Sequence, residues 1–195
     1  MPLAFSTGMK HRLLNRPVFA LVFSILSAAM LGANTPVSVD VENGAGKTYV
    51  VDAAFDVNVP TSLAWKVLTD YEGIGRFVSS IRQSTIQRRE AGRVLLEQHG
   101  VGRAWIVSLP MHVVLDVREH DQRMLVFRDV CGKSFTTYEG TWELTTIGSG
   151  TRVTYRLIAD PNGRQPAMVA RSAIKGSVRK LLDEVRVEML ARAAR

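Results

Sequence analysis

The sequence of 195 residues has a single cysteine, Cys131, and only four histidines. One cysteine excludes an intramolecular disulfide, and no HExxH, CxxC or comparable spacing of metal ligands occurs. A GxSxG elbow, a P-loop and a GxGxxG dinucleotide fingerprint are also missing. We therefore expect no metal, no cofactor and no motif-based catalytic centre.

Long hydrophobic runs are also scarce. The uncharged apolar stretch from Val18 to Ala33 is shorter than the roughly 20 residues of a membrane-spanning helix. It follows basic residues and ends in small ones, which is the order typical of a secretory signal peptide. We predict a signal peptide over residues 1–33, cleaved after Ala29 or Ala33, and a periplasmic or secreted protein. A retained membrane anchor is the alternative.

Acidic residues are fewer than basic ones, 18 against 25, and the formal net charge is +7. Lys10, Arg12 and Arg16 belong to the predicted signal peptide, so the remainder has 22 basic and 18 acidic side chains, a net charge of +4. This small excess does not indicate a nucleic-acid partner. It is compatible with a transient contact to an anionic membrane surface.

The remaining composition, 46% hydrophobic, suffices for the core of one domain. Residues 34–46 are polar and contain Pro and Gly, which predicts a flexible leader, and residues 47–195 form the predicted domain. Its first element is a strand over Tyr49–Val59, where apolar odd positions alternate with mostly polar even ones. A short helix from Thr61 follows.

Gly73 and Gly75 interrupt this helix and predict a second short helical segment or turn after it. Six strand-like runs then extend to Asp160, and their connectors, EAG, GVGR, HDQ, VCGK and GSG, are too short for crossover helices, which indicates an antiparallel sheet. Apolar residues at helical spacing from Ile174 to Met189 predict one long C-terminal helix.

The predicted fold class is therefore α+β. It comprises a curved antiparallel sheet of about seven strands, two short N-terminal helices and one long C-terminal helix across the apolar face of the sheet. A single helix does not fill the concave side of such a sheet. We expect a tunnel between them, with the short helices closing one end.

The segment VPTSLAWKVLTDYEGIGRFV, residues 59–78, carries a family resemblance. Seven of its residues resemble the N-terminal signature of the START-like (SRPBCC) superfamily, particularly the polyketide cyclase/dehydrase and coenzyme-Q-binding branch: Trp65, Val67, Leu68, Thr69, Asp70, Tyr71 and Phe77. The element order matches over residues 47–193. This resemblance implies a helix-grip fold with an internal hydrophobic cavity that carries lipids, quinones, sterols or polyketides, and in a minority of relatives catalyses cyclisation.

Ligand pockets are mostly apolar, so large side chains on the faces expected to point inward are the candidate ligand contacts. These are Trp65, Phe77, Trp105, Leu109, Met111, Trp142, Tyr155, Ile174 and Val178. Ordinary core packing without a ligand is the alternative for each of them.

Titratable side chains indicate no catalytic residue. Asp70 precedes a helix end broken by glycine, so we expect it to cap the next turn. His112 and Asp116 are four residues apart on one strand, roughly 13 Å, which is too far for a hydrogen bond. We expect His99 and His120 to be exposed at strand ends.

Arg171, Lys175 and Arg179 form a basic edge beside the apolar stripe of the C-terminal helix. A solvated edge is the ordinary interpretation. The alternative is that these side chains contact anionic lipid headgroups while the helix gates the cavity.

The sequence thus predicts an exported single-domain protein that binds or carries a hydrophobic small molecule or lipid, such as a quinone, sterol, fatty or polyketide-like compound. One alternative is a cyclase or dehydratase that acts on a polyketide-like substrate in the same cavity. The other is a non-catalytic interaction module whose cavity is filled by its own side chains.

Overall fold

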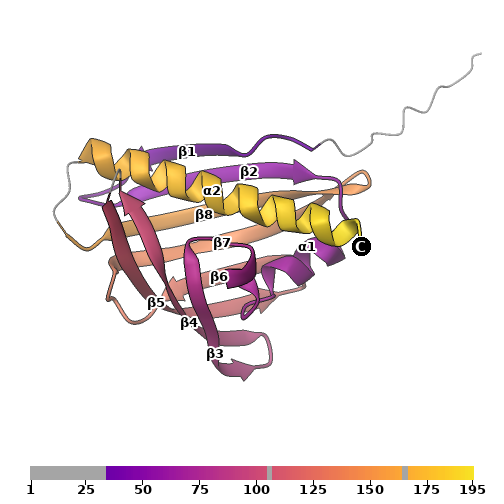
Figure 1. The fold of residues 1–195 in the computed structure, drawn as a ribbon, viewed down its shortest axis with the longest axis horizontal. Helices are drawn as coiled ribbons and strands as arrows, with labels where there is room; N and C mark the ends of the chain where they lie inside the picture. Colours follow the sequence, from indigo (N-terminus) through magenta and orange to yellow (C-terminus); the bar gives the residue numbers. More distant parts are fainter. Residues whose placement is uncertain (1–33, 105–106, 164–166) are drawn as a thin grey trace, which may run out of the picture.

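The computed structural model describes residues 34–104, 107–163 and 167–195. The predicted signal peptide and Trp105 lie outside these ranges. The elements are β1 (Ser38–Asn43), β2 (Tyr49–Val57), α1 (Thr61–Leu68), the 3₁₀ helix η1 (Ile74–Arg76), β3 (Ile81–Glu90), β4 (Arg93–Ala104), β5 (Val107–His120), β6 (Met124–Asp129), β7 (Phe135–Ile147), β8 (Gly150–Pro161) and α2 (Ala167–Ala193). Figure 1 shows α2 crossing the sheet diagonally.

The strands form one antiparallel sheet in the order β1-β2-β8-β7-β6-β5-β4-β3. This confirms the predicted α+β fold with an antiparallel sheet, and the sheet has eight strands instead of about seven. From β3 to β8 each strand pairs with the next. The connection from β2 to β3 instead passes from one side of the sheet to its far edge, and α1 and η1 make that passage.

The prediction of a flexible leader over residues 34–46 is wrong. Ser38–Asn43 form the edge strand β1, which pairs with β2 from Ser38↔Ala54 to Asn43↔Tyr49. Val37, Val39 and Val41 are buried, and the residues between them are exposed. The segment therefore carries the period of two that is typical of a half-buried strand, although its overall composition is polar.

The predicted hairpin turn at GVGR is also wrong, because β4 continues through these residues to Ala104. Gly100 is required for a close approach, since a β-carbon at this position would collide with the carbonyl oxygen of Ser80. The N–H group of Val101 donates to that same oxygen at 2.8 Å. The glycine thus brings the segment after η1 against β4, which is a known use of glycine within a strand.

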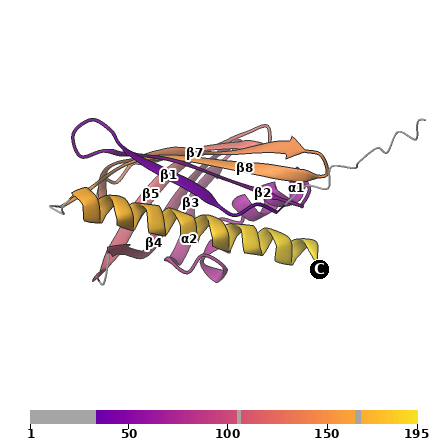
Figure 2. The same cartoon turned by 90° about the horizontal axis from the view of Figure 1, so that it is seen from above.

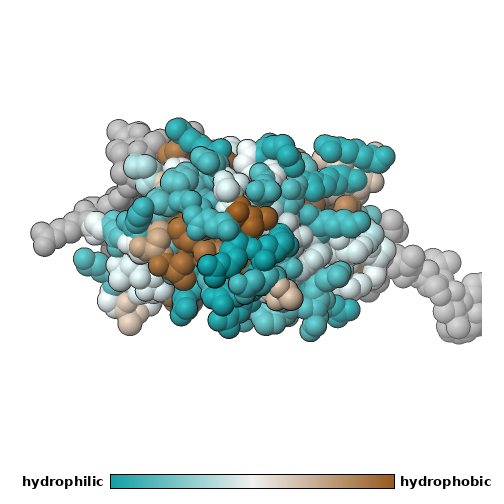
Figure 3. Space-filling view, turned by 90° about the horizontal axis from the view of Figure 1, so that it is seen from below, coloured by the Kyte–Doolittle hydropathy of each residue, from teal (hydrophilic) through white to brown (hydrophobic). Residues whose placement is uncertain are grey.

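Helix α2 contacts β1, β2, β4 and α1. In the view from above, α2 lies against the layer of β1, β2, β7 and β8, and β3–β5 extend from that layer toward the helix (Figure 2). The C-terminal half of α2 provides the tight contacts, because Leu182, Val185 and Met189 are buried. The surface seen from below is mainly hydrophilic, with apolar side chains gathered near its middle (Figure 3).

Asp70 explains why α1 is short. Its Oδ1 accepts a hydrogen bond from the N–H group of Gly73 at 3.1 Å, which confirms the predicted cap, and its Oδ2 accepts one from Arg192 Nη2 of α2 at 2.7 Å. A side chain at Gly73 would collide with the Asp70 carboxylate and with Arg76. Gly73 and Asp70 therefore specify the end of α1. Through its hydrogen bond from Arg192, Asp70 also links this segment to the C-terminal end of α2.

The Asp70 contacts predict acid-sensitive stability. Burial raises the pKa of the Asp70 carboxyl. The hydrogen bond and charge of Arg192, the charge of Arg76 and the hydrogen bond from the Gly73 N–H lower this pKa by more, so it lies below its ordinary value. A depressed pKa contributes stability that is complete above the unfolded-state value of about 3.9 and is lost as the pH falls through the folded-state value.

Asp70→Asn should therefore lower the free energy of unfolding by about 1 kcal/mol at pH 7, a partly solvent-screened contribution. Once the pH falls below the depressed folded-state pKa of Asp70, the wild-type carboxyl is also neutral, and the difference should shrink toward zero. Urea unfolding at pH 7 and over a descending acid series measures this. Asp52→Asn is the control, because the Asp52–Arg156 pair is exposed and should contribute less than about 0.5 kcal/mol. An equal loss of stability in Asp70→Asn and Asp52→Asn would contradict a stabilising role for the Asp70 contacts.

Candidate functional site

A cavity of about 1080 Å³ lies between the concave face of the sheet and the N-terminal half of α2. Its wall is predominantly apolar, with inward-facing side chains from the central strands: Leu96, Leu115, Val117, Leu125, Phe127 and Leu157. Leu68, Tyr71 and Ile74 contribute from the end of α1 to the start of η1. The volume is at the upper end of the range for small-molecule pockets.

The two halves of α2 differ in side-chain size, and this difference leaves the space open. Where the helix faces the cavity, small residues are interspersed among Ile174, Val178 and Leu181: Ala170, Ala173, Gly176 and Ser177. Small side chains there cannot reach the sheet, whereas the large ones of the C-terminal half fill the space down to β1 and β2. The cavity therefore follows from the sequence of α2 as well as from the curvature of the sheet.

An aromatic wall, which we define as Phe127, Tyr138, Trp142 and Tyr155, spans β6, β7 and β8. The ring of Tyr155 lies 4.4 Å from Trp142 and 6.1 Å from Phe127, and Phe127 lies 5.7 Å from Tyr138, all between ring centroids. Gly140 makes room for this packing, because a β-carbon there would lie 2.8 Å from the Phe127 ring. The wall offers flat apolar surface with two phenol hydroxyls.

Few polar groups lie within the cavity. The hydroxyls of Tyr138 and Tyr155 hydrogen-bond to each other, and burial raises the pKa of both phenols. Both therefore stay neutral at physiological pH and act as hydrogen-bonding groups only. Gln98, 6% exposed, donates from Nε2 to Ser84 Oγ at 3.2 Å. These groups suit the orientation of a mainly apolar molecule.

The cavity opens to solvent where its lining residues are exposed. These residues come from β3 and β5, from the loops and from one side of α2: Ser79, Arg82, Pro110, Lys133, Asn162 and Ser177. Asn162, just after β8, is linked to the loop between β6 and β7, since its Nδ2 donates to the carbonyl oxygens of Gly132 and Lys133 at 3.0 and 3.1 Å. The opening thus lies beside the first half of α2.

Five of the predicted ligand contacts lie on the cavity wall: Met111, Trp142, Tyr155, Ile174 and Val178. Trp65 and Phe77 instead pack in and against the core beside the cavity, and the Arg192 guanidinium lies 5.5 Å above the Phe77 ring. Leu68, one turn after Trp65 on the same side of α1, lines the cavity instead. Trp105 and the side chain of Leu109 lie outside the described part of the structure.

Three further residues line the cavity and were not predicted from the sequence: Gln98, Phe127 and Tyr138. Tyr138 is four residues before Trp142 on the same strand, so the period of two already placed both on one face. Phe127 pairs with Gly140 across β6 and β7, a partnership that becomes visible only once the register is known. Gln98 alternates with Glu97 and His99 and gives no apolar signal of its own.

His112 and Asp116 do not interact, as their spacing predicted. Asp116 accepts hydrogen bonds from Arg93 at 2.7 and 2.9 Å, and His112 Nε2 lies 2.7 Å from Glu97 Oε1. Neither His112 nor Asp116 is among the residues that line the cavity. The pair therefore provides no proton-transfer group for the cavity.

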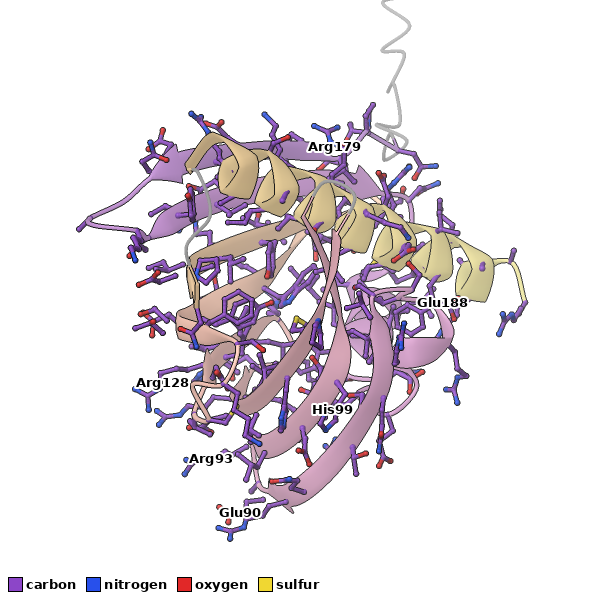
Figure 4. All side chains as sticks on the ribbon, turned by 60° about the vertical axis from the view of Figure 1, so that its left-hand side comes forward. Glu90, Arg93, His99, Arg128, Arg179 and Glu188 are labelled. Atoms are coloured by element: carbon purple, nitrogen blue, oxygen red, sulfur yellow. The ribbon has the colours of Figure 1, made fainter. Side chains whose placement is uncertain are left out.

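The predicted basic edge on α2 divides into two parts. All three residues are exposed, but Arg179 Nη1 also donates to the carbonyl oxygen of Val37 at 3.0 Å, and Figure 4 shows Arg179 on the side of α2 next to β1. Contact of Arg171 and Lys175 with a membrane surface stays a prediction. Within the described residues, no helix combines the length and the apolar character that crossing a membrane requires.

A curved antiparallel sheet, a long C-terminal helix against its concave side and a cavity between them define a helix-grip protein of the START-like class. The model of the family described as Polyketide cyclase / dehydrase and lipid transport matches residues 48–189, and the chain belongs to this family. The family resemblance seen in residues 59–78 is thereby confirmed.

Solved structures agree with the fold. A STAR-related lipid transfer protein from Xanthomonas axonopodis superposes with a TM-score of 0.67 at 18% identity, over 82% of this chain and 98% of the other. The Zhui aromatase/cyclase from Streptomyces sp. R1128 gives 0.61 at 16% identity, over 75% and 96%. A START superfamily protein from Mycobacterium smegmatis gives 0.63 at 14% identity, over 73% and 97%. No curated protein matches the chain.

Proposed function

We propose that this protein binds a hydrophobic small molecule or lipid non-covalently in the cavity between the sheet and α2, and carries it. The observation that supports the proposal most directly is the cavity itself, about 1080 Å³ with predominantly apolar walls. Transfer of apolar ligand surface out of water contributes about 25 cal/mol per Å². Gln98 and the Tyr138–Tyr155 pair orient the polar part of the ligand.

A carrier fits the wall chemistry better than a cyclase. Among the described residues that line the cavity, none is Asp, Glu or His, the side chains that most often transfer protons in catalysis. The hydroxyls of Tyr138 and Tyr155 are held neutral by their raised pKa values. The lipid-transfer relative from Xanthomonas axonopodis therefore suggests the function of this chain better than the aromatase/cyclase does.

We further propose that the protein is exported, on the basis of residues 1–33. They place basic residues before an apolar stretch that ends in small residues, the order of a signal peptide. Export would place the carrier in the periplasm or outside the cell. N-terminal sequencing of the protein from the extracellular or periplasmic fraction tests this; a chain that retains residue 1 in the cytoplasmic fraction contradicts it.

Titration with N-phenyl-1-naphthylamine, a neutral apolar fluorophore, tests ligand binding. We expect saturable binding at one site per chain, with the emission enhanced because the dye leaves water. Long-chain fatty acids and quinones should displace it competitively in proportion to their affinity. Non-saturable binding, or saturable binding that no hydrophobic competitor reduces, would contradict a carrier.

A further inference from the structure

The outer face of the sheet brings together three metal-ligating side chains that are not adjacent in the sequence. Glu97 and His99 alternate along β4 with Leu96 and Gln98, which face the cavity, so they point to the opposite face. His112 of β5 is paired directly with His99. Cross-strand neighbours on one face are close in space, so the three side chains meet on the face away from the cavity.

The distances between their ligand atoms suit one metal ion. Glu97 Oε1 lies 2.7 Å from His112 Nε2 and 3.3 Å from His99 Nε2. The ligand atoms of the three residues all lie within 4.8 Å of one another. Two ligands bound to zinc at about 2.1 Å in tetrahedral geometry are roughly 3.4 Å apart. Small side-chain rotations are enough to place an ion between them.

The surroundings hold two of the ligands in position. Gln87 Nε2 of β3 donates to Glu97 Oε2 at 2.7 Å, which leaves Oε1 directed at the histidines. Outer hydrogen bonds of this kind orient metal-binding carboxylates. The backbone of His112 is fixed as well, because its N–H group donates to Ser134 Oγ at 2.9 Å.

The site is sheltered on one side and open on the other. The exposed fractions of the side chains are 21% for His112, 28% for Glu97 and 46% for His99. Figure 4 shows His99 on β4, at a distance from the hairpin end that carries Glu90 and Arg93. Three protein ligands with an open side leave a fourth position for water, as in zinc sites that have two histidines and a glutamate.

We propose that Glu97, His99 and His112 bind one divalent transition-metal ion, with Zn²⁺ as the reference ion and water as the fourth ligand. The site is independent of the proposed carrier function. The sequence-based expectation of no metal site rested on spacing along the chain. The antiparallel pairing of β4 with β5 supplies the proximity that the spacing lacks.

A bound ion would cross-link β4 and β5 next to Gly100 and Met111, which are also paired with each other. Met111 lines the cavity. The ion would therefore stabilise the part of the sheet that borders the opening. Because only the folded state brings the three ligands together, Zn²⁺ should raise the melting temperature in a concentration-dependent way.

The histidines of the predicted domain provide a matched experiment. The mature protein without an affinity tag is treated with chelator, dialysed and titrated with Zn²⁺ by calorimetry. We expect one ion per chain. His99→Ala and His112→Ala should each weaken binding at least tenfold, and His120→Ala should leave the affinity unchanged. Circular dichroism of each variant confirms that it is folded.

His99→Ala decides the outcome even if His112→Ala is unstable, since the His99 side chain is the most exposed of the three. Gln87→Ala should weaken binding less than either histidine variant, because Gln87 orients Glu97 without binding the ion. Absence of saturable Zn²⁺ binding, or equal affinity in wild type and His99→Ala, would overturn the proposal and leave a hydrogen-bonded Glu97–His112 pair without a metal.

Discussion

Ala173→Trp should weaken the binding of the apolar fluorophore at least tenfold, about 1.4 kcal/mol, while the protein stays folded. Ala173 lies on the side of α2 that faces the cavity and is half-buried. An indole at this position projects into open space, so it displaces ligand without displacing backbone. The same substitution in a filled core would instead cost stability through overpacking.

Val187→Trp is the matched control, because Val187 is on the same helix and is 58% exposed. It should leave the affinity for the fluorophore unchanged. Both proteins are compared by fluorescence titration and by thermal unfolding. Undiminished binding in Ala173→Trp would place the ligand elsewhere, and an equal loss in both variants would indicate a general effect on α2.

Leu182→Ala should lower the free energy of unfolding by about 2–5 kcal/mol, the largest stability effect we expect from a single truncation in α2. The Leu182 side chain is 0% exposed and packs where the helix has no free space beneath it. Removal of the side chain leaves a new cavity that the surrounding core cannot close.

The neighbouring Leu181→Ala should cost less than half as much, about 1 kcal/mol. Leu181 lines the existing cavity and is half-buried, so its truncation enlarges a space that is already there. Urea unfolding of both variants gives the comparison. Equal costs would mean that the side of α2 that faces the cavity packs as tightly as the buried side, which would contradict an open cavity.

The periodic elements could be predicted from the sequence. The alternation in Tyr49–Val59 gave β2, and the helical spacing from Ile174 to Met189 gave α2, because each pattern reports directly which face is buried. The short connectors gave the antiparallel order. The break at Gly73 was also predictable, and Asp70 caps it as expected.

Features that depend on pairing between distant segments were not predictable in the same way. β1 was missed because a polar edge strand resembles a linker until its partner β2 is known. The glycines of GVGR resembled a turn, although Gly100 serves the approach of Ser80. The cluster of Glu97, His99 and His112 depends on the register between β4 and β5, which alternation on its own does not fix.

Within the candidate site, the faces of the strands and of α2 could be assigned more reliably than the face of the short helix α1. Met111, Trp142 and Tyr155 lie on the cavity wall, as their strand positions indicated. Trp65 does not, although it lies three residues before Leu68 on the same side of α1. Its aromatic size suggested a ligand contact, but its side chain is buried in the core, and Leu68, one turn later, is the residue that reaches the cavity.

Native mass spectrometry tests the occupancy of the cavity most directly. The full-length gene is expressed and the mature protein is purified without detergent, and its mass is compared before and after extraction with organic solvent. We predict a one-to-one complex that releases a hydrophobic molecule, and a strongly reduced amount of this molecule on Ala173→Trp purified in parallel. A protein that carries no such molecule and also fails to bind added fatty acid, quinone or N-phenyl-1-naphthylamine would contradict a carrier function.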